Sequence, residues 1–249
     1  MSARSSRALS VRPLWARFAA VRFAAAALAL ILLGAGSAGC SVVKKINSVR
    51  HTVDSNRATI KTFTDGLKNS KTMPFQVTYV TTGGSPATVV YSVQPPDNIA
   101  FSETASGSDT SATDLIANSS GTYSCSQASQ GAQWTCEKLG KASATAQHEL
   151  FAVYTPAHWV TFLQALSVGA GLAGDKVTTS TKTVTGFSMH CVDLFAKGEG
   201  ASTFCTTSQD VLGYVKVGAE STSFEIKSYT SSPPASAFQL PAGATVTRR

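Results

Sequence analysis

The chain has 249 residues, of which 43% are hydrophobic and 14% are charged, so it can bury one sizeable core and is no charged disordered tail. Its formal net charge is +7 at pH 7. Five arginines and no acidic residue precede Cys40, seven basic and two acidic residues lie from Cys40 to Lys71, and residues 72–249 carry a net −3. This distribution excludes a basic domain that binds nucleic acid.

Residues 1–39 contain the three parts of a secretory signal peptide. A basic segment that ends at Arg22 precedes an apolar run, residues 23–33, and a stretch of small residues, 34–39. This order is that of a signal peptide with its cleavage site. The apolar run is too short and too rich in alanine for a membrane span, so we expect the rest of the chain to be exported.

Cys40 ends the segment Ser37-Ala38-Gly39-Cys40, which resembles the bacterial lipobox. In that motif the cysteine is diacylated, with chains such as palmitate, and becomes the first residue of the mature protein. Ser37 stands where the motif usually has Leu, Val or Ile. The resemblance implies a protein that lipid anchors to the extracytoplasmic face of the cell membrane. The alternative is ordinary cleavage near Ser37 or Gly39, which would give a soluble secreted protein.

Residues 40–71 are predicted to be the lipidated N-terminus and a basic amphipathic helix. From Val42 to Leu67 the apolar residues recur at helical spacing, apart from a polar gap near Asn56 and Arg57. A basic helix beside a lipid anchor would lie against anionic headgroups, which contribute about 1 kcal/mol per charge near the surface. A helix face exposed to solvent explains the same pattern, and the two alternatives stay open.

Residues 72–249 predict a β-rich domain that forms a single domain with residues 40–71. Alternating apolar and polar residues, separated by turns, indicate short strands within 75–79, 89–93, 99–103, 115–116, 123–125 and 134–136. Further along the chain, the segments 182–195, 202–207, 213–217 and 224–229 are also strand-like, and the tail from Pro233 is irregular. Because no helices alternate with these strands, an antiparallel meander is favoured over a parallel sheet.

One helix is predicted among the strands, at residues 156–167. Thr155 is a suitable N-cap, and Pro156 suits the first helical position. The apolar residues that follow fall on one helical face, at Trp159, Phe162, Leu163 and Leu166.

Four cysteines remain after Cys40, and an exported protein is expected to oxidise them. Three pairings are possible. We predict the local disulfides Cys125–Cys136 and Cys191–Cys205, because each would close a plausible hairpin. Closing a loop of ~15 residues is worth about 3 kcal/mol in the chain-entropy model. A zinc site is the alternative, but no Cys-x-x-Cys occurs and only His190 adjoins a cysteine, so no metal is predicted.

The sequence lacks the common catalytic and cofactor-binding motifs, so we predict a protein that is not an enzyme and has no cofactor. HExxH, G-x-S-x-G, GxGxxG and a phosphate-binding loop are all absent. His190 and Asp193 are close in sequence, but in a strand their spacing places them on opposite faces. The glycine-rich stretch 169–174 follows a helix, so it is interpreted as the exit from that helix.

Three segments near the C-terminus carry a family resemblance: the strand Gly186–Leu194, the turn with Asp210 and Gly213, and Phe238–Pro241. With the order of helix, strands, helix and meander, residues 42–246 resemble the LolA/LolB-like lipoprotein carrier superfamily. The closest resemblance is to LppX/LprG-type actinobacterial lipoproteins. It implies an α+β fold, a strongly curved antiparallel β-sheet (half-barrel) covered by helices on its concave side. In that family the sheet encloses an apolar cavity that holds acyl chains.

The resemblance implies a membrane-anchored envelope lipoprotein that binds or carries a hydrophobic ligand, such as a lipid, a glycolipid or acyl chains, in an apolar cavity. The candidate lining residues are apolar positions of the strands and the second helix: Phe75, Val77, Tyr79, Val89, Tyr91, Val93, Trp159, Phe162, Leu166, Phe224 and Ile226. The same residues could instead fill a core. The alternative function is therefore a non-catalytic envelope sensor or interaction lipoprotein, with an envelope protein as its partner and no bound ligand.

Replacing Cys40 with Ser should release the protein from the membrane, because a serine side chain cannot take the thiol-linked lipid. Fractionation of an exporting bacterial host, followed by immunoblotting, measures this. The wild-type chain is expected in the membrane pellet, with Ser41→Ala as the matched control that stays there, and Cys40→Ser in the soluble fraction. Retention of the processed Cys40→Ser protein in the pellet would contradict the lipid anchor.

Overall fold

The computed structural model describes residues 39–69, 73–83, 86–107, 110–142, 144–145, 159–161, 163–164, 170, 177–196, 200–218 and 222–248. Residues 47–249 form one compact unit, and both grooves described below lie within it. None of the helices in these ranges is long and apolar enough to cross a membrane.

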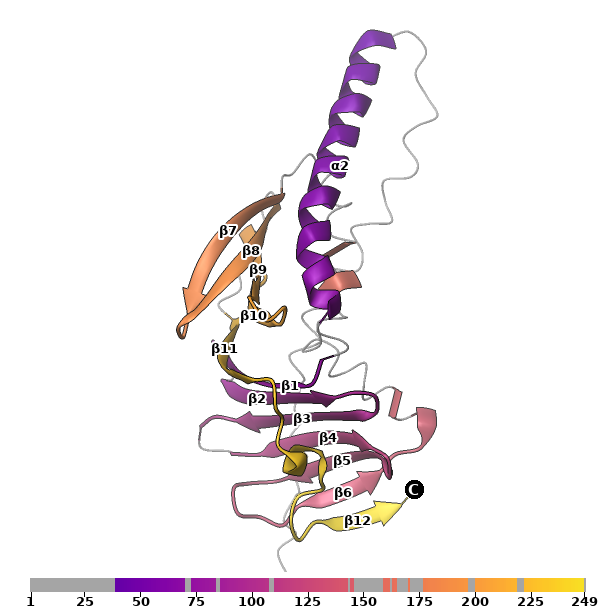
Figure 1. Cartoon of the computed structure of the whole chain (residues 1–249), viewed down its shortest axis with the longest axis vertical. Helices are drawn as coiled ribbons and strands as arrows, with labels where there is room; N and C mark the ends of the chain where they lie inside the picture. The colour runs from indigo at the N-terminus through magenta and orange to yellow at the C-terminus, as the bar shows by residue number, and fades with distance from the viewer. Residues whose placement is uncertain are drawn as a thin grey trace, which may run out of the picture. The chain divides into compact units, whose positions relative to one another are not determined.

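The described strands form one sheet of twelve, in the order β12-β6-β5-β4-β3-β2-β1-β11-β10-β9-β8-β7 (Figure 1). Their bounds are β1 Phe75–Thr82, β2 Ala87–Gln94, β3 Asn98–Ala105, β4 Ala112–Asn118, β5 Gly121–Gln127, β6 Thr135–Lys138, β7 Val177–Val184, β8 Phe187–Ala196, β9 Gly200–Thr207, β10 Leu212–Lys216, β11 Ser223–Thr230 and β12 Thr245–Arg248. Neighbouring strands are antiparallel, except that β12 runs parallel to β6. β12 and β7 are the two edges of this sheet.

The predicted fold class is wrong. We expected a purely antiparallel half-barrel whose concave side is covered by helices, whereas the twelve strands form an open, mixed sheet. The mixed character arises because the C-terminal tail, predicted to be irregular, returns to the sheet as β12. Helical cover is also limited: in the described ranges α2 (Gly39–Asn69) is the only long helix, and its buried residues pack against strands β7 to β10.

The predicted strands occur near their expected positions, but one predicted strand is in fact a hairpin of two strands. The segment 182–195 is divided between β7 and β8, which are joined by Thr185 and Gly186. Both residues have positive φ, 51° and 83°, as a two-residue type I′ turn requires. Threonine is a poor signal for such a turn, so the sequence pattern did not indicate it.

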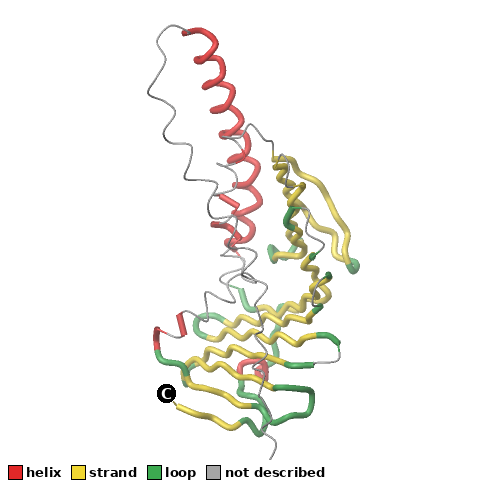
Figure 2. Tube along the Cα trace, turned by 180° about the vertical axis from the view of Figure 1, so that it is seen from behind, coloured by secondary structure: helices red, strands yellow, loops and turns green. Residues whose placement is uncertain are grey.

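α2 confirms the helix predicted within residues 40–71, and Cys40 lies in its first turn. Ile60, Phe63 and Leu67 are spaced three and four residues apart, so they share one face of the helix. All three are buried in a cluster with apolar residues of β7, β8, β9 and β10. This stripe fixes the C-terminal part of α2 to one face of those four strands (Figure 2).

The predicted helix at 156–167 is described only in part, at residues 159–161 and 163–164, which are helical. Trp159, Val160 and Leu163 join the cluster beneath α2. The ring of Trp159 packs on Phe204 of β9, with ring centroids 5.1 Å apart. The other residues of that prediction lie outside the described ones.

The segment after β11 covers one face of the strands at the β12 end of the sheet. The 3-10 helix η4 (Ala235–Phe238) buries Phe238 against Ala100 and Ile116, which lie opposite each other on β3 and β4. The Asn118 side chain donates a hydrogen bond of 2.8 Å to the carbonyl of Phe238. Leu240 then packs near the first disulfide.

Both predicted disulfides are confirmed. Cys125 of β5 is bonded to Cys136 of β6, and Cys191 of β8 is bonded to Cys205 of β9. In each case the two cysteines are direct cross-strand partners. The bridges therefore fix the register of two hairpins, one in each half of the strand order.

Candidate functional site

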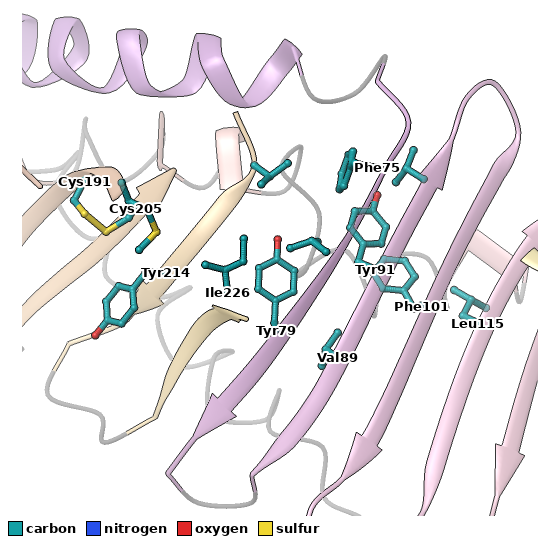
Figure 3. Close-up of a cluster of buried hydrophobic side chains, with 14 residues drawn as sticks. Phe75, Tyr79, Val89, Tyr91, Phe101, Leu115, Cys191, Cys205, Tyr214 and Ile226 are labelled. Carbon is teal, nitrogen blue, oxygen red and sulfur yellow. A yellow bond between two sulfur atoms is a disulfide. The ribbon is translucent and has the colours of Figure 1, made fainter. Parts of the chain in front are cut away.

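The residues predicted to line a cavity lie in different parts of the structure. Seven of them belong to one buried cluster (Figure 3): Phe75, Val77, Tyr79, Val89, Tyr91, Val93 and Ile226. Phe224 is partly buried against that cluster, and Trp159 belongs to the cluster beneath α2. Phe162 and Leu166 lie outside the described residues.

Direct contacts between aromatic rings fill much of this cluster. Tyr91 stacks on Phe101 with ring centroids 4.5 Å apart, and Phe75 meets Tyr91 edge-on at 5.6 Å. Tyr79 stacks on Phe224 at 4.1 Å. Burial raises the pKa of the Tyr79 and Tyr91 hydroxyls above their usual range. These contacts are those of a packed core, and a lipid cavity among these residues stays a prediction.

His190 and Asp193 do not meet. His190 pairs with Thr206 across β8 and β9, whereas Asp193 pairs with Thr203, and the odd spacing puts their side chains on opposite faces of the sheet. Asp193 accepts hydrogen bonds from the hydroxyls of Ser180, at 2.5 Å, and Thr203, at 2.6 Å. Its carboxylate therefore ties β8 to the strands on both sides.

An open groove of about 730 Å³ lies between α2 and the strands β7, β8 and β9. Its helical wall includes Thr59, Thr62 and Phe63. Its floor is rich in hydroxyl side chains, among them Thr179 and Thr181 of β7. The groove thus presents several hydroxyl groups together with apolar surface, and an edge strand of the sheet, β7, forms part of it.

Two contacts position α2 along this groove. The Asn56 side chain is only 2% exposed, and its Oδ1 accepts a hydrogen bond of 3.0 Å from the backbone N–H of Val177. Further along the helix, Gly66 lies against Asp210, so that a Cβ at position 66 would be 2.8 Å from Asp210 Oδ1. The hydrogen bond of Asn56 and the absence of a Cβ at Gly66 thus set how closely α2 approaches the sheet.

A second open groove, of about 380 Å³, lies on β3, β4 and β5 beside Trp134. Hydroxyl and amide side chains line it, including Ser102 and Gln127. Asp114 lies opposite Ser102 in the strand register, and its Oδ1 is buried without a hydrogen-bond partner. Burial raises the pKa of the Asp114 carboxyl, and a hydrogen bond with Ser102 acts in the opposite direction.

Metal-ligating side chains do not gather within the described ranges. No three His, Cys, Asp or Glu side chains there lie close enough together to hold a metal ion. The four cysteines after Cys40 are bonded in pairs and offer no thiolate.

The residues that form the groove beside α2 were not predicted from the sequence as a site. Asn56 was interpreted only as part of a polar gap in the helix, although it is a buried hydrogen-bond acceptor. Thr179 and Thr181 precede the segment 182–195 that was predicted to be strand-like. The run of β-favouring threonines in residues 178–183 was the available signal.

Comparison with known proteins gives distant structural similarity only. No protein-family model matches the chain, and no curated protein matches it in sequence. The chain is similar to an uncharacterized conserved protein from Thermus thermophilus, with 8% identity, a TM-score of 0.43, and coverage of 76% of this chain and 98% of that one.

It is also similar to MucB, with 12% identity, a TM-score of 0.45, and coverage of 75% of this chain and 64% of that one. The Pseudomonas aeruginosa MucA/MucB complex gives 9% identity, a TM-score of 0.44, and coverage of 76% and 63%. The chain thus spans less than two thirds of these MucB chains. Similarity at this level carries no argument about function, which has to come from the geometry.

Asp114→Asn should stabilise the protein at pH 7 by roughly 1 kcal/mol, because it removes a partly buried charge. A carboxyl whose pKa is raised on folding destabilises the folded state above that raised pKa, and has no such effect below its ordinary pKa of 3.8. The gain should therefore shrink as the pH falls towards 3.8.

Urea unfolding of both proteins across this pH range measures the difference. Asp97→Asn, in an exposed turn, is the matched control and should change stability little at any pH. A gain from Asp114→Asn that is the same at every pH would contradict the assignment of the raised pKa to Asp114.

Proposed function

We propose that this protein is a non-catalytic interaction protein of the cell envelope. Its signal peptide exports it, lipid on Cys40 holds it at the membrane, and the folded unit binds a partner polypeptide. It carries no lipid in its interior.

The observation that carries this proposal is the contrast between the closed aromatic cluster and the open groove beside α2. Phe75, Tyr79 and Tyr91 are at most 5% exposed and contact other aromatic rings. The groove, in contrast, is open and rich in hydroxyl groups. A lipid tail would leave those hydroxyls without partners, whereas a polypeptide offers backbone and side-chain groups that pair with them.

The framework around the groove also supports a binding role. The Cys191–Cys205 disulfide joins β8 to β9, the Asp193 carboxylate ties β7 to β9 through β8, and Asn56 holds α2 to β7. A site whose walls are fixed before binding loses little conformational entropy when the partner arrives. The groove is therefore suited to specific recognition.

Mass spectrometry of an organic-solvent extract tests the proposal. The Cys40→Ser chain, exported and processed by a bacterial host, is purified without its own acyl chains, and an unrelated secreted protein purified in the same way is the control. We expect lipid only at the level of the control. A lipid present in stoichiometric amount would contradict the proposal and would instead establish a carrier.

A further inference from the structure

β7 is an edge strand of the described sheet, with a regular register. Its eight residues, VTTSTKTV, pair with β8 in unbroken register from Val177, opposite Leu194, to Val184, opposite Phe187. Most of its side chains are exposed. In the order of the described strands, β7 has a neighbour on one side only.

The turn that follows β7 identifies the backbone groups that face away from β8. When a hairpin is closed by two residues, the flanking pair, here Val184 and Phe187, exchanges both of its backbone hydrogen bonds. Along an antiparallel strand, the backbone N–H and C=O groups of successive residues then point alternately towards the partner strand, here β8, and away from it. The outward N–H and C=O groups are therefore those of Thr183, Thr181 and Thr179.

Two independent contacts agree with this alternation. Val177 is two residues before Thr179, so its backbone groups should also face outward. Its N–H indeed donates to Asn56 of α2 and not to β8. Cys191 and Cys205 are bridged with Cα atoms 3.9 Å apart, which fits a cross-strand pair without backbone hydrogen bonds between them. The backbone N–H and C=O of Cys191 must then form their hydrogen bonds with β7, where Ser180 is its partner. The same alternation requires this. Asn56 thus accepts from the first outward N–H of β7, and the next outward residues, Thr179 and Thr181, line the groove beside α2.

The β7 edge lacks the features that usually protect an edge strand from pairing. It contains no proline and no bulge, and Lys182 is its only charged residue. The Nζ of Lys182 lies 4.3 Å from the centre of the Tyr214 ring, so this charge is directed across the sheet and does not guard the edge. The other edge strand, β12, has only four residues, and a short edge is itself a protection.

We propose that the edge of β7 and the groove beside α2 form one site, which binds an extended peptide segment as an additional β-strand. This inference rests on the proposed function and names its site and its ligand. The outward groups of Thr179, Thr181 and Thr183 pair with the backbone of the peptide. Because Thr179 and Thr181 also line the groove, alternate side chains of the peptide enter the space between β7 and α2.

The chemistry of the site selects a polypeptide with hydroxyl, amide or basic side chains. A lipid would leave the outward backbone groups of β7 unpaired, whereas an extended peptide pairs with each of them. Asp210 contributes a carboxylate to the groove, and it forms no ion pair with another described residue. A Lys or Arg of the peptide would therefore find its counter-charge at Asp210.

A peptide library tests this site directly. The full processed chain, held by its own anchor in phospholipid nanodiscs, is panned against phage-displayed random dodecapeptides. The enriched peptides are synthesised, and their dissociation constants are measured by fluorescence anisotropy. We expect enriched sequences that favour extended structure and carry a Lys or Arg.

Thr181→Pro should weaken binding of these peptides by roughly tenfold or more, because it removes an outward N–H and places a ring at the edge. The N–H of residue 181 does not face β8, so the sheet should tolerate the proline. Thr181→Val is the matched comparison: it keeps the backbone N–H and the side-chain shape and removes only the groove hydroxyl, so its loss of affinity should be several-fold smaller than that of Thr181→Pro. Thermal unfolding of both variants checks that each is folded.

A second measurement changes the peptide and leaves the protein intact. Each backbone amide of the tightest peptide is N-methylated in turn. Strand addition requires that only alternate amides face β7, so the loss of affinity should alternate along the peptide with a period of two.

A third variant tests the role of the carboxylate. Asp210→Asn suits the φ of 58° at this position, because Asn tolerates the left-handed region. It should weaken peptides that carry Lys or Arg by about fivefold, and leave their Ala-substituted analogues unchanged.

Binding that is lost in Thr181→Pro and largely kept in Thr181→Val, with alternating effects of N-methylation, would support the site. Failure to enrich any peptide, equal binding by the two variants, or effects of N-methylation without alternation would overturn it. Self-association of the chain that Thr181→Pro abolishes would also overturn it, by making a second copy the occupant of the edge. These results leave the proposed function standing, whereas a stoichiometric lipid in the solvent extract refutes the proposed function itself.

Discussion

The structure depends on one constraint: the backbone N–H and C=O groups of a sheet need partners. Inside the described sheet the neighbouring strands supply them, whereas each of its two edge strands has a neighbouring strand on one side only. β12 limits the problem because it is short. β7 is longer and regular, and α2 supplies a partner for its first outward N–H, that of Val177. The position of the candidate site follows from this difference between the two edges.

The rest of the fold holds that edge in place. The apolar stripe of α2 anchors the helix on β7 to β10, while Asn56 and Gly66 set its distance from the strands. The Cys191–Cys205 bridge and the Asp193 carboxylate fix the three strands under the groove. A peptide that binds there would meet a prepared surface, so the entropy lost on binding would come mainly from the peptide.

Features formed between neighbours in sequence could be predicted, and those formed between distant segments could not. Both disulfides lie within single hairpins, so their cysteines were paired correctly from spacing alone. β12 pairs with β6, and the partner of Asn56 is 121 residues away, so no local pattern indicated either contact. Alternation in β1 and β2 identified which face is buried, but the same apolar residues suit a filled core and a hollow one. The prediction of a helix-covered half-barrel is wrong because the fold depends on pairings between distant segments. The cavity stays a prediction because the same apolar pattern suits a filled core and a hollow one.

Amide hydrogen exchange along β7, resolved by residue with NMR in the unliganded chain, tests most directly whether this edge is free. A free edge gives exchange that alternates with a period of two along the strand. Slow exchange is expected at Thr178, Ser180 and Lys182, whose amides face β8, and also at Val177, which is bonded to Asn56. Fast exchange is expected at Thr179, Thr181 and Thr183. Slow exchange at these three threonines would show that the edge is already covered, and would contradict the peptide site.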